Sequence, residues 1–212
     1  NRNSIIFSSN KNRVSFITAH TLSIAETSAN IGYINSAINV TVLLSGNIDS
    51  NLFSGVKCKQ GSQYVTTLVV SQTSVICQVQ SATAGVAQVS LWYSASDAYG
   101  GDIALSANSI SVILVETMTI SSLLPFAAIS ASQEVTVTTS TSADPYGGLV
   151  SYSCRYTSTG ASHAAVRAGN AYTCTLARQT VHTNEQVNLY VTSNHFGSLL
   201  LTTNTLPFSW YD

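Results

Sequence analysis

The stretch YSCRY, residues 152–156, has a counterpart earlier in the chain in VKCK, where Cys58 occupies the position of Cys154. A second cysteine follows each of these, Cys77 in SVICQV and Cys174 in AYTCTL. The members of each pair lie about 95 to 98 residues apart. Two cysteines that recur at matched positions indicate a tandem duplication.

Other segments repeat at the same offset and in the same order. They are NVTV with Asn39 and EVTV with Glu134, QVSLWYS and QVNLYVTS, and LSAN and LTTN, which end at Asn108 and Asn204. Several matches in register are the behaviour of a repeat array, so we predict two repeats at residues 21–116 and 117–212.

The first 20 residues resemble the end of a repeat. IFSSN, which ends at Asn10, is similar to LLTTN, which ends at Asn204, and RVSF follows it as a strand with alternating apolar residues. We therefore predict that residues 1–20 hold the closing strand of a preceding repeat and that the chain is a segment of a longer array. In an alternative, residues 5–16 complete the sheet of a neighbouring subunit by strand addition, which would give head-to-tail polymers.

Each repeat contains short segments rich in Val, Ile, Thr and Tyr, separated by turn signals such as DPYGG, which begins at Asp144. The expected strands are residues 40–44, 64–70, 74–79, 89–94 and 109–115, then 134–139, 149–156, 171–176, 187–193 and 208–211. Residues 158–170 are expected to form a loop. About seven short strands in about 95 residues are typical of a β-sandwich, so the predicted fold class is all-β.

The second repeat resembles a known family. A strand with Cys-Arg-Tyr, then Tyr-Thr-Cys, then QVNLYV and a closing strand with Phe208 and Tyr211 is similar to IPT/TIG domains, which are immunoglobulin-like. ISSLLP, which begins at Ile120, fits the opening strand of that family. The first repeat departs from it, since residues 22–29 have no Pro and residues 112–115 no aromatic pair. The resemblance implies two tandem IPT/TIG-like sandwiches, as in ectodomains of surface receptors and adhesion proteins.

Composition excludes several classes of function. Charged residues make up only 8% of the chain, and the eight Lys and Arg residues form no basic cluster, so we expect no nucleic-acid partner. Apolar stretches are too short for membrane insertion in this segment. Ser and Thr supply about a quarter of the residues, which suits an extracellular or cell-surface protein with O-linked glycans. Asn39-Val40-Thr41 is a sequon for an N-linked glycan on Asn39.

The four cysteines allow three pairings. The duplication favours Cys58–Cys77 and Cys154–Cys174, each closing a loop of about 20 residues and contributing roughly 3 kcal/mol. Such bridges would join neighbouring segments, unlike the inter-sheet bridge of antibody domains. The alternative is four buried free thiols in a cytosolic protein. No CxxC motif is present and no histidine lies within four residues of a cysteine, so no metal site is expected.

Side chains that could carry chemistry are scattered. The four histidines form no HxH or HExxH motif and are expected to be solvated loop residues: His20, His163, His182 and His195. No GxSxG turn or paired carboxylates occur, so we predict neither catalysis nor a cofactor. Asp97 and Asp102 flank a YGG turn and offer an alternative as Ca²⁺ ligands. Trp92 and Tyr190 are expected to pack across strands, or else to contact a sugar or protein partner.

The sequence therefore predicts a structural or adhesive repeat segment of an extracellular glycoprotein. It would form a rod, fibre or surface appendage by lateral or head-to-tail association with other copies or other surface proteins. Low surface charge favours such packing because little repulsion opposes it. The alternative is a ligand-binding ectodomain of a cell-surface receptor. A third possibility is a set of accessory domains of a secreted enzyme whose catalytic part lies outside this chain.

Overall fold

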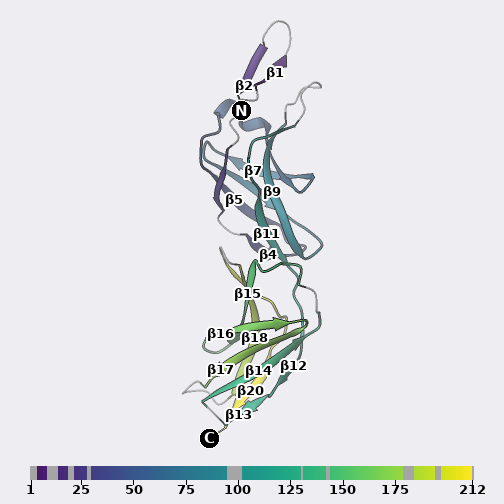
Figure 1. Cartoon of the computed structure of the whole chain (residues 1–212), viewed down its shortest axis with the longest axis vertical. Coiled ribbons are helices and arrows are strands. Elements are labelled where there is room, and N and C mark those ends of the chain that lie inside the picture. The colour runs from purple at the N-terminus through teal and green to yellow at the C-terminus, as the bar shows by residue number, and fades with distance from the viewer. Residues whose placement is uncertain are drawn as a thin grey trace. The chain divides into compact units, whose positions relative to one another are not determined.

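The computed structural model describes residues 4–8, 14–18, 22–27, 30–94, 102–129, 131–141, 144–178, 184–193 and 197–211, with side chains from residue 22 onward except residues 26 and 27. The described chain is built almost entirely of β-strands. These form two nine-stranded sheets and one two-stranded sheet (Figure 1). The all-β class predicted from the sequence is confirmed.

The first nine-stranded sheet contains strands between Ile24 and Val115 and one short helix. The elements are β3 (Ile24–Thr27), β4 (Ile31–Tyr33), β5 (Ile38–Leu44), η1 (Ser50–Gly55), β6 (Val56–Gln60), β7 (Gln63–Val70), β8 (Ser74–Val79), β9 (Gly85–Tyr93), β10 (Ile103–Ala104) and β11 (Ile110–Val115). The strand order is β3-β5-β8-β7-β6-β9-β11-β4, with β10 paired to β9. In immunoglobulin nomenclature β3-β5-β8-β7 correspond to strands A, B, E and D, and β6-β9-β11 to C, F and G, which is the order of an immunoglobulin-like sandwich.

The second nine-stranded sheet repeats this order. Its strands are β12 (Ile120–Leu124), β13 (Ala127–Ala128), β14 (Ser132–Thr139), β15 (Val150–Tyr156), β16 (Ser162–Ala168), β17 (Ala171–Ala177), β18 (Asn184–Ser193), β19 (Ser198–Leu200) and β20 (Leu206–Trp210). They follow the order β12-β14-β17-β16-β15-β18-β20-β13, with β19 paired to β18. Each strand therefore has an equivalent in the first sheet, and the chain consists of two tandem immunoglobulin-like repeats.

One sequence prediction was wrong. Residues 158–170 were expected to form a loop, but β16 occupies Ser162–Ala168 and pairs with β15 on one side and β17 on the other. Its sequence, SHAAVRA, has one β-branched residue, so intrinsic propensity gave little sign of a strand. Backbone hydrogen bonds to the two neighbouring strands stabilise β16 despite its low intrinsic strand propensity.

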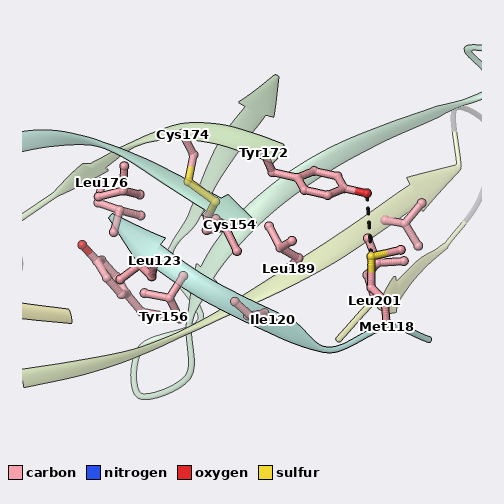
Figure 2. Close-up of a cluster of buried hydrophobic side chains, with 14 of the residues drawn as sticks. Met118, Ile120, Leu123, Cys154, Tyr156, Tyr172, Cys174, Leu176, Leu189 and Leu201 are labelled. Atoms are coloured by element: carbon pink, nitrogen blue, oxygen red, sulfur yellow. Dashed lines mark hydrogen bonds between the residues drawn. A yellow bond between two sulfur atoms is a disulfide. The ribbon is translucent and has the colours of Figure 1, made fainter. Parts of the chain in front are cut away.

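The core of the second repeat lies between the two halves of its sheet path. Alternation along β14 turns Val135, Val137 and Thr139 inward. Val135 and Val137 join a hydrophobic cluster to which both halves of the sheet contribute and which also contains Phe208. Leu176 and Leu189 of this cluster are labelled in Figure 2. Burial of one such aliphatic or aromatic side chain contributes roughly 1.5–3 kcal/mol, so this cluster is the main source of stability for the repeat.

The chain divides into two compact units. Unit 1 comprises Asn1–Asn30, Ser36–Ser81 and Ala87–Val112, and unit 2 comprises Ile31–Asn35, Ala82–Val86 and Ile113–Asp212. Strand β4 and the last residues of β11 therefore belong to unit 2. Ile31, Ile113 and Val115 are part of the buried cluster of that unit.

The duplication extends to individual hydrogen bonds. Asn108 Oδ1 accepts from Ile24 N at 2.8 Å, and Asn108 Nδ2 donates to Ile24 O at 3.2 Å. Asn204 makes the same two bonds to Ile120, at 2.7 and 2.9 Å. The matching motifs LSAN and LTTN therefore hold the opening strand of their own repeat, β3 or β12.

The N-terminal segment forms a separate hairpin. Strand β1 (Ser4–Ser8) pairs antiparallel with β2 (Val14–Thr18), with Ile6 opposite Phe16. The structure thus has two strands where the sequence suggested a single closing strand. That residues 1–20 derive from a preceding repeat stays a prediction.

Candidate functional site

The structure has two disulfides, Cys58–Cys77 and Cys154–Cys174, and all four cysteines are buried. The first joins β6 to β8 and the second joins β15 to β17. In each repeat one further strand, β7 or β16, lies between the two bridged strands in the sheet path. The bridged strands are therefore not adjacent in the sheet path. The intervening segment was predicted as a strand in the first repeat (residues 64–70) but as a loop in the second (residues 158–170).

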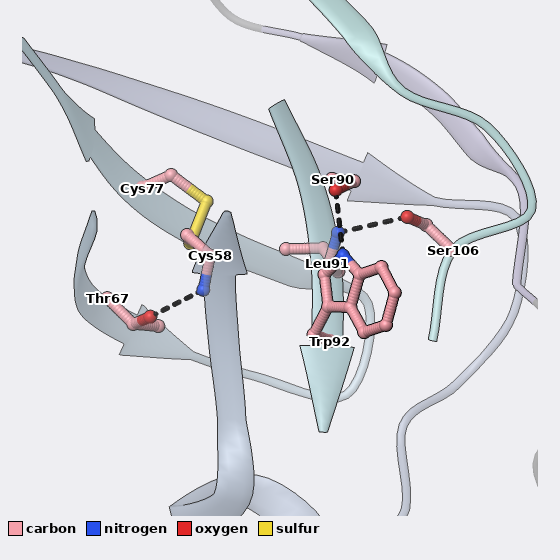
Figure 3. Close-up of a disulfide and its surroundings, with 7 residues drawn as sticks. All are labelled: Cys58, Thr67, Cys77, Ser90, Leu91, Trp92 and Ser106. Carbon is pink, nitrogen blue, oxygen red and sulfur yellow. Dashed lines mark hydrogen bonds between the residues drawn. A yellow bond between two sulfur atoms is a disulfide. The ribbon is translucent and has the colours of Figure 1, made fainter. Parts of the chain in front are cut away.

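The surroundings of the first disulfide are ordered by hydroxyl groups (Figure 3). Thr67 Oγ1 accepts a hydrogen bond from Cys58 N at 3.0 Å. On the neighbouring strand β9, Leu91 N donates to Ser106 Oγ at 2.9 Å. Thr202 Oγ1 takes the place of Ser106 in the second repeat and accepts from Leu189 N at 3.3 Å. These short side chains satisfy backbone donors that would otherwise be buried unpaired.

In the first repeat a lysine packs against two aromatic rings and pairs with an aspartate. Lys59 Nζ lies 3.9 Å from the centroid of the Trp92 ring and 4.7 Å from that of Tyr64. It also forms an ion pair with Asp102 Oδ2 at 3.2 Å. The hydrogen bond between Tyr64 and Asp102 raises the pKa of the Tyr64 hydroxyl and lowers the pKa of the carboxyl. Cation–π contacts of this kind stabilise exposed sites modestly.

The second repeat has the same arrangement with different chemistry. The guanidinium carbon of Arg155 lies 4.1 Å from the centroid of the Tyr190 ring, and Arg155 donates to Ser198 Oγ at 2.9 Å. These three residues take the places of Lys59, Trp92 and Asp102. In both repeats a cation covers one face of the strand aromatic, so packing within the sheet explains Trp92 and Tyr190.

Arg167 on β16 forms a second network, with Asp144 and with Tyr152 on β15. Arg167 Nη1 and Asp144 Oδ2 are 2.7 Å apart, and Tyr152 donates to Asp144 Oδ1 at 3.2 Å. Burial and the nearby Asp144 charge raise the pKa of Tyr152. Asp144 also accepts from Tyr146 N at 3.3 Å, as expected for the first residue of the DPYGG turn. The turn is thereby tied to the sheet.

The predicted glycosylation site lies on a strand. Asn39 is exposed on β5, where its Oδ1 accepts a 3.4 Å hydrogen bond from Gln78 Nε2. Its equivalent in the second repeat, Glu134, is also exposed. The amide of Asn39 therefore faces solvent, and its glycosylation stays a prediction.

The candidate residues for carrying chemistry or binding a metal ion are histidines and aspartates. Within the described ranges, no three His, Cys, Asp or Glu residues gather in a way that could hold a metal ion. His163 lies on β16 rather than in a loop, which corrects the expectation for this residue. His20, His182, His195 and Asp97 lie outside the described residues.

No described helix is long and apolar enough to cross a bilayer.

The closing strand has a different aromatic pair from the one expected. Phe208 and Trp210 are both buried and pack edge to face with centroids 5.0 Å apart. Tyr211, predicted to pair with Phe208, is exposed. Successive residues of a strand point to opposite faces, so Phe208 and Trp210 share a face that Tyr211 cannot reach.

Sequence reasoning missed a buried acid. Glu185 is only 1% exposed, and the Ser158 hydroxyl donates to its Oε2. The signal was present, because Glu185 is in phase with the inward residues Val187 and Leu189 of β18. Its first-repeat equivalent is Ala87, so this buried carboxylate is a feature of the second repeat alone.

Two sets of exposed apolar side chains stand out. One is a single exposed valine at the equivalent position of each repeat: Val69 on β7 is the register partner of Ile76 on β8, and Val166 on β16 is the register partner of the equivalent Thr173 on β17. Both valines are exposed, Val69 by 52% and Val166 by 74%. The other, called here the edge patch, consists of Phe126, Ile129 and Tyr211 beside β13 and β20. Large exposed apolar side chains that lie close together are candidates for protein contact.

No protein-family model and no curated protein matches this sequence. Similar solved structures include the full extracellular region of plexin A4, with 13% identity over 87% of this chain and a TM-score of 0.33. Others are fibronectin(III)-like modules of Clostridium thermocellum CbhA (12% identity, 90% of this chain, 92% of that chain, TM-score 0.41) and chicken CNTN1 FN1–FN3 domains (12%, 90%, 65%, 0.35). The chain spans 24% of the plexin structure. Its own strand order, repeated twice, identifies it as a pair of tandem immunoglobulin-like repeats.

Proposed function

We propose that the chain is a structural or adhesive repeat segment of an extracellular glycoprotein, and that it builds a rod, fibre or surface appendage. In this role it makes lateral or head-to-tail contacts with other copies and carries out no chemical reaction. The observation that carries the proposal is the pair of exposed valines, Val69 and Val166, at one position of both repeats. A contact surface that recurs with the repeat suits a periodic assembly.

An oxidising compartment is supported by the cysteines. All four are paired, one bond within each repeat. Disulfides of this kind persist in extracellular and cell-surface proteins and are rare in the cytosol. We assign the repeats to residues 21–116 and 117–212 on the matched hydrogen bonds of Asn108 and Asn204.

Low charge supports lateral packing. Only 8% of residues are charged and the net charge is −1, so long-range repulsion between copies is weak. Strands β7 and β16 lie inside their sheets, and their exposed valines project from the faces. A neighbouring chain would bury these side chains without breaking any backbone pairing.

Two double variants test the lateral surface. Val69→Lys with Val166→Lys places two charges in it, whereas Gln63→Lys with Ser162→Lys adds the same charge at exposed positions of the same strands. The purified chain is concentrated and followed by sedimentation velocity and electron microscopy. We expect concentration-dependent assembly of the unmodified chain and of the control, and its loss in the valine variant. A chain that stays monomeric at every concentration would instead favour the ligand-binding receptor ectodomain.

A further inference from the structure

The end of the first repeat is integrated into unit 2. In that unit β4 runs parallel to the end of β11, and the register pairs Val115 with Tyr33. Val115 is fully buried in the cluster that contains Met118 and Leu201. Tyr33 packs against the same cluster, and its hydroxyl donates to Leu200 O at 2.9 Å. Burial raises the pKa of this hydroxyl.

The second repeat ends in the same geometry. Strand β13 runs parallel to β20, with Ala127 opposite Ser209 and Ala128 opposite Trp210. Ile129 and Tyr211 are the next residues after these two register pairs. This pair is the equivalent of Tyr33 and Val115, because the registers of the two parallel pairs match residue for residue.

The equivalent residues differ sharply in exposure. Val115 is 0% exposed, but Tyr211 is 57% and Ile129 is 78% exposed. Phe126, 66% exposed, lies beside them because its carbonyl accepts from Ser209 N at 3.0 Å. The backbone of this edge is fully formed, since Tyr211 N also donates to Ala128 O at 2.9 Å. The edge patch thus has the same backbone arrangement as the end of the first repeat. At the end of the first repeat Val115 is covered by apolar side chains, whereas the side chains of the edge patch are exposed.

We propose that the edge patch is the docking site for the leading end of a covalently linked immunoglobulin-like repeat of this type. The leading end is the part of a repeat around Met118, Tyr146 and Leu200, which in unit 2 surrounds Val115 and Tyr33. Its chemistry is a set of apolar side chains and one carbonyl that accepts a hydrogen bond. The inference rests on the proposed function, because a rod of repeats needs a fixed contact between each repeat and the next one along the same chain.

The size of the patch favours a covalently linked repeat over a free second copy. Three exposed side chains offer far less than the roughly 800 Å² per partner of a stable protein interface. A linked repeat needs no such area, since a short connection gives it an effective concentration of about millimolar. The contact is also smaller than that in unit 2, because Ala127 and Ser209 replace Ile31 and Ile113.

The test uses the full chain and an extended chain in which a copy of residues 117–212 follows Asp212. Asp212 takes the position of Glu116 and the next residue is again Thr117, so the junction has its natural length and an acidic residue. Hydroxyl-radical labelling and peptide mass spectrometry report the exposure of Phe126 and Tyr211. We expect their labelling to fall several-fold in the extended chain, while the labelling of Val166 stays unchanged.

Variants separate docking from folding. Ile129→Asp in the extended chain should restore the labelling of Tyr211, whereas Ile129→Val and the exposed control Val166→Asp should leave it protected. The inference is overturned if labelling of Tyr211 is equal in both chains. It is also overturned if the unextended chain shows concentration-dependent protection, because a second copy would then cover the patch. Either failure leaves the outcome of the lateral-surface experiment, and so the proposed function, untouched.

Discussion

Asn204 holds Ile120 by both ends of its side-chain amide, with Ile120 N donating to Oδ1 at 2.7 Å and Nδ2 donating to Ile120 O at 2.9 Å. The two residues are 84 apart in sequence. Asn108 and Ile24 repeat the arrangement at the same separation. An Asn at this position therefore fixes where the opening strand of each repeat lies against its closing segment.

Replacing this Asn should weaken the repeat that contains it. Asn204→Ala leaves a backbone donor and acceptor of Ile120 without partners, so we expect the free energy of unfolding to fall by about 1–3 kcal/mol. Chemical denaturation measures the loss. Thr205→Ala, at the exposed neighbouring residue, is the control and should change stability by less than about 0.5 kcal/mol. Equal effects of the two substitutions would show that the amide has no special role.

Removal of a disulfide should also destabilise its own repeat. The bond between Cys154 and Cys174 spans 20 residues, and Cys154→Ala with Cys174→Ala should lower the free energy of unfolding by roughly 3 kcal/mol. Denaturation followed by the fluorescence of Trp210, which lies in that repeat, measures the change. Peptide mapping without reduction supplies the control. A peptide joining Cys58 to Cys154 or Cys174 would contradict the pairing on which this expectation depends.

The stability of the second repeat should depend on pH through His163. Burial lowers the pKa of His163 below its ordinary value of 6.5. The unfolded chain therefore binds a proton below about pH 6.5 while the folded chain still resists it. The free energy of unfolding should fall as the pH drops from 6.5 to below the folded-state pKa.

The matched variant for this prediction is His163→Val, because Val65 occupies the equivalent position opposite Cys58. Urea denaturation between pH 7.5 and pH 5 compares the two proteins. The unmodified chain should lose stability over this range and the variant should lose less, since carboxyl groups titrate mainly below it. Parallel curves would assign the pH dependence to other groups.

Glycosylation is tested on protein secreted from eukaryotic cells. The exposed amide of Asn39 should carry an N-linked glycan, so enzymatic removal of such glycans should reduce the mass of the chain. Asn39→Gln should show no such shift. Thr41→Ser keeps the sequon and should retain it. A secreted chain whose mass is unaffected by the treatment would remove the N-linked glycan from the proposal.

The repeats, and the strands whose inward and outward residues alternate, could be predicted from the sequence. Ser74–Val79 was predicted to the residue, because inward Val75, Cys77 and Val79 alternate with less buried residues. Strand β16 was missed, since its Ala-rich sequence forms a strand only between two partners. The short strands β4 and β13 have too few residues for any periodicity. Their parallel pairing depends on contacts far apart in sequence, so the edge patch could only be found from the structure.

The parallel pairing of β13 with β20 has a mechanical consequence. Strand β13 lies near the start of its repeat and β20 at its end, so tension applied to the two ends of the repeat pulls these strands in opposite directions. The bonds between them, Tyr211 N to Ala128 O and Ser209 N to Phe126 O, are then loaded together in shear. They must break at once rather than one after another, which makes the repeat suited to bearing a pulling force along its length.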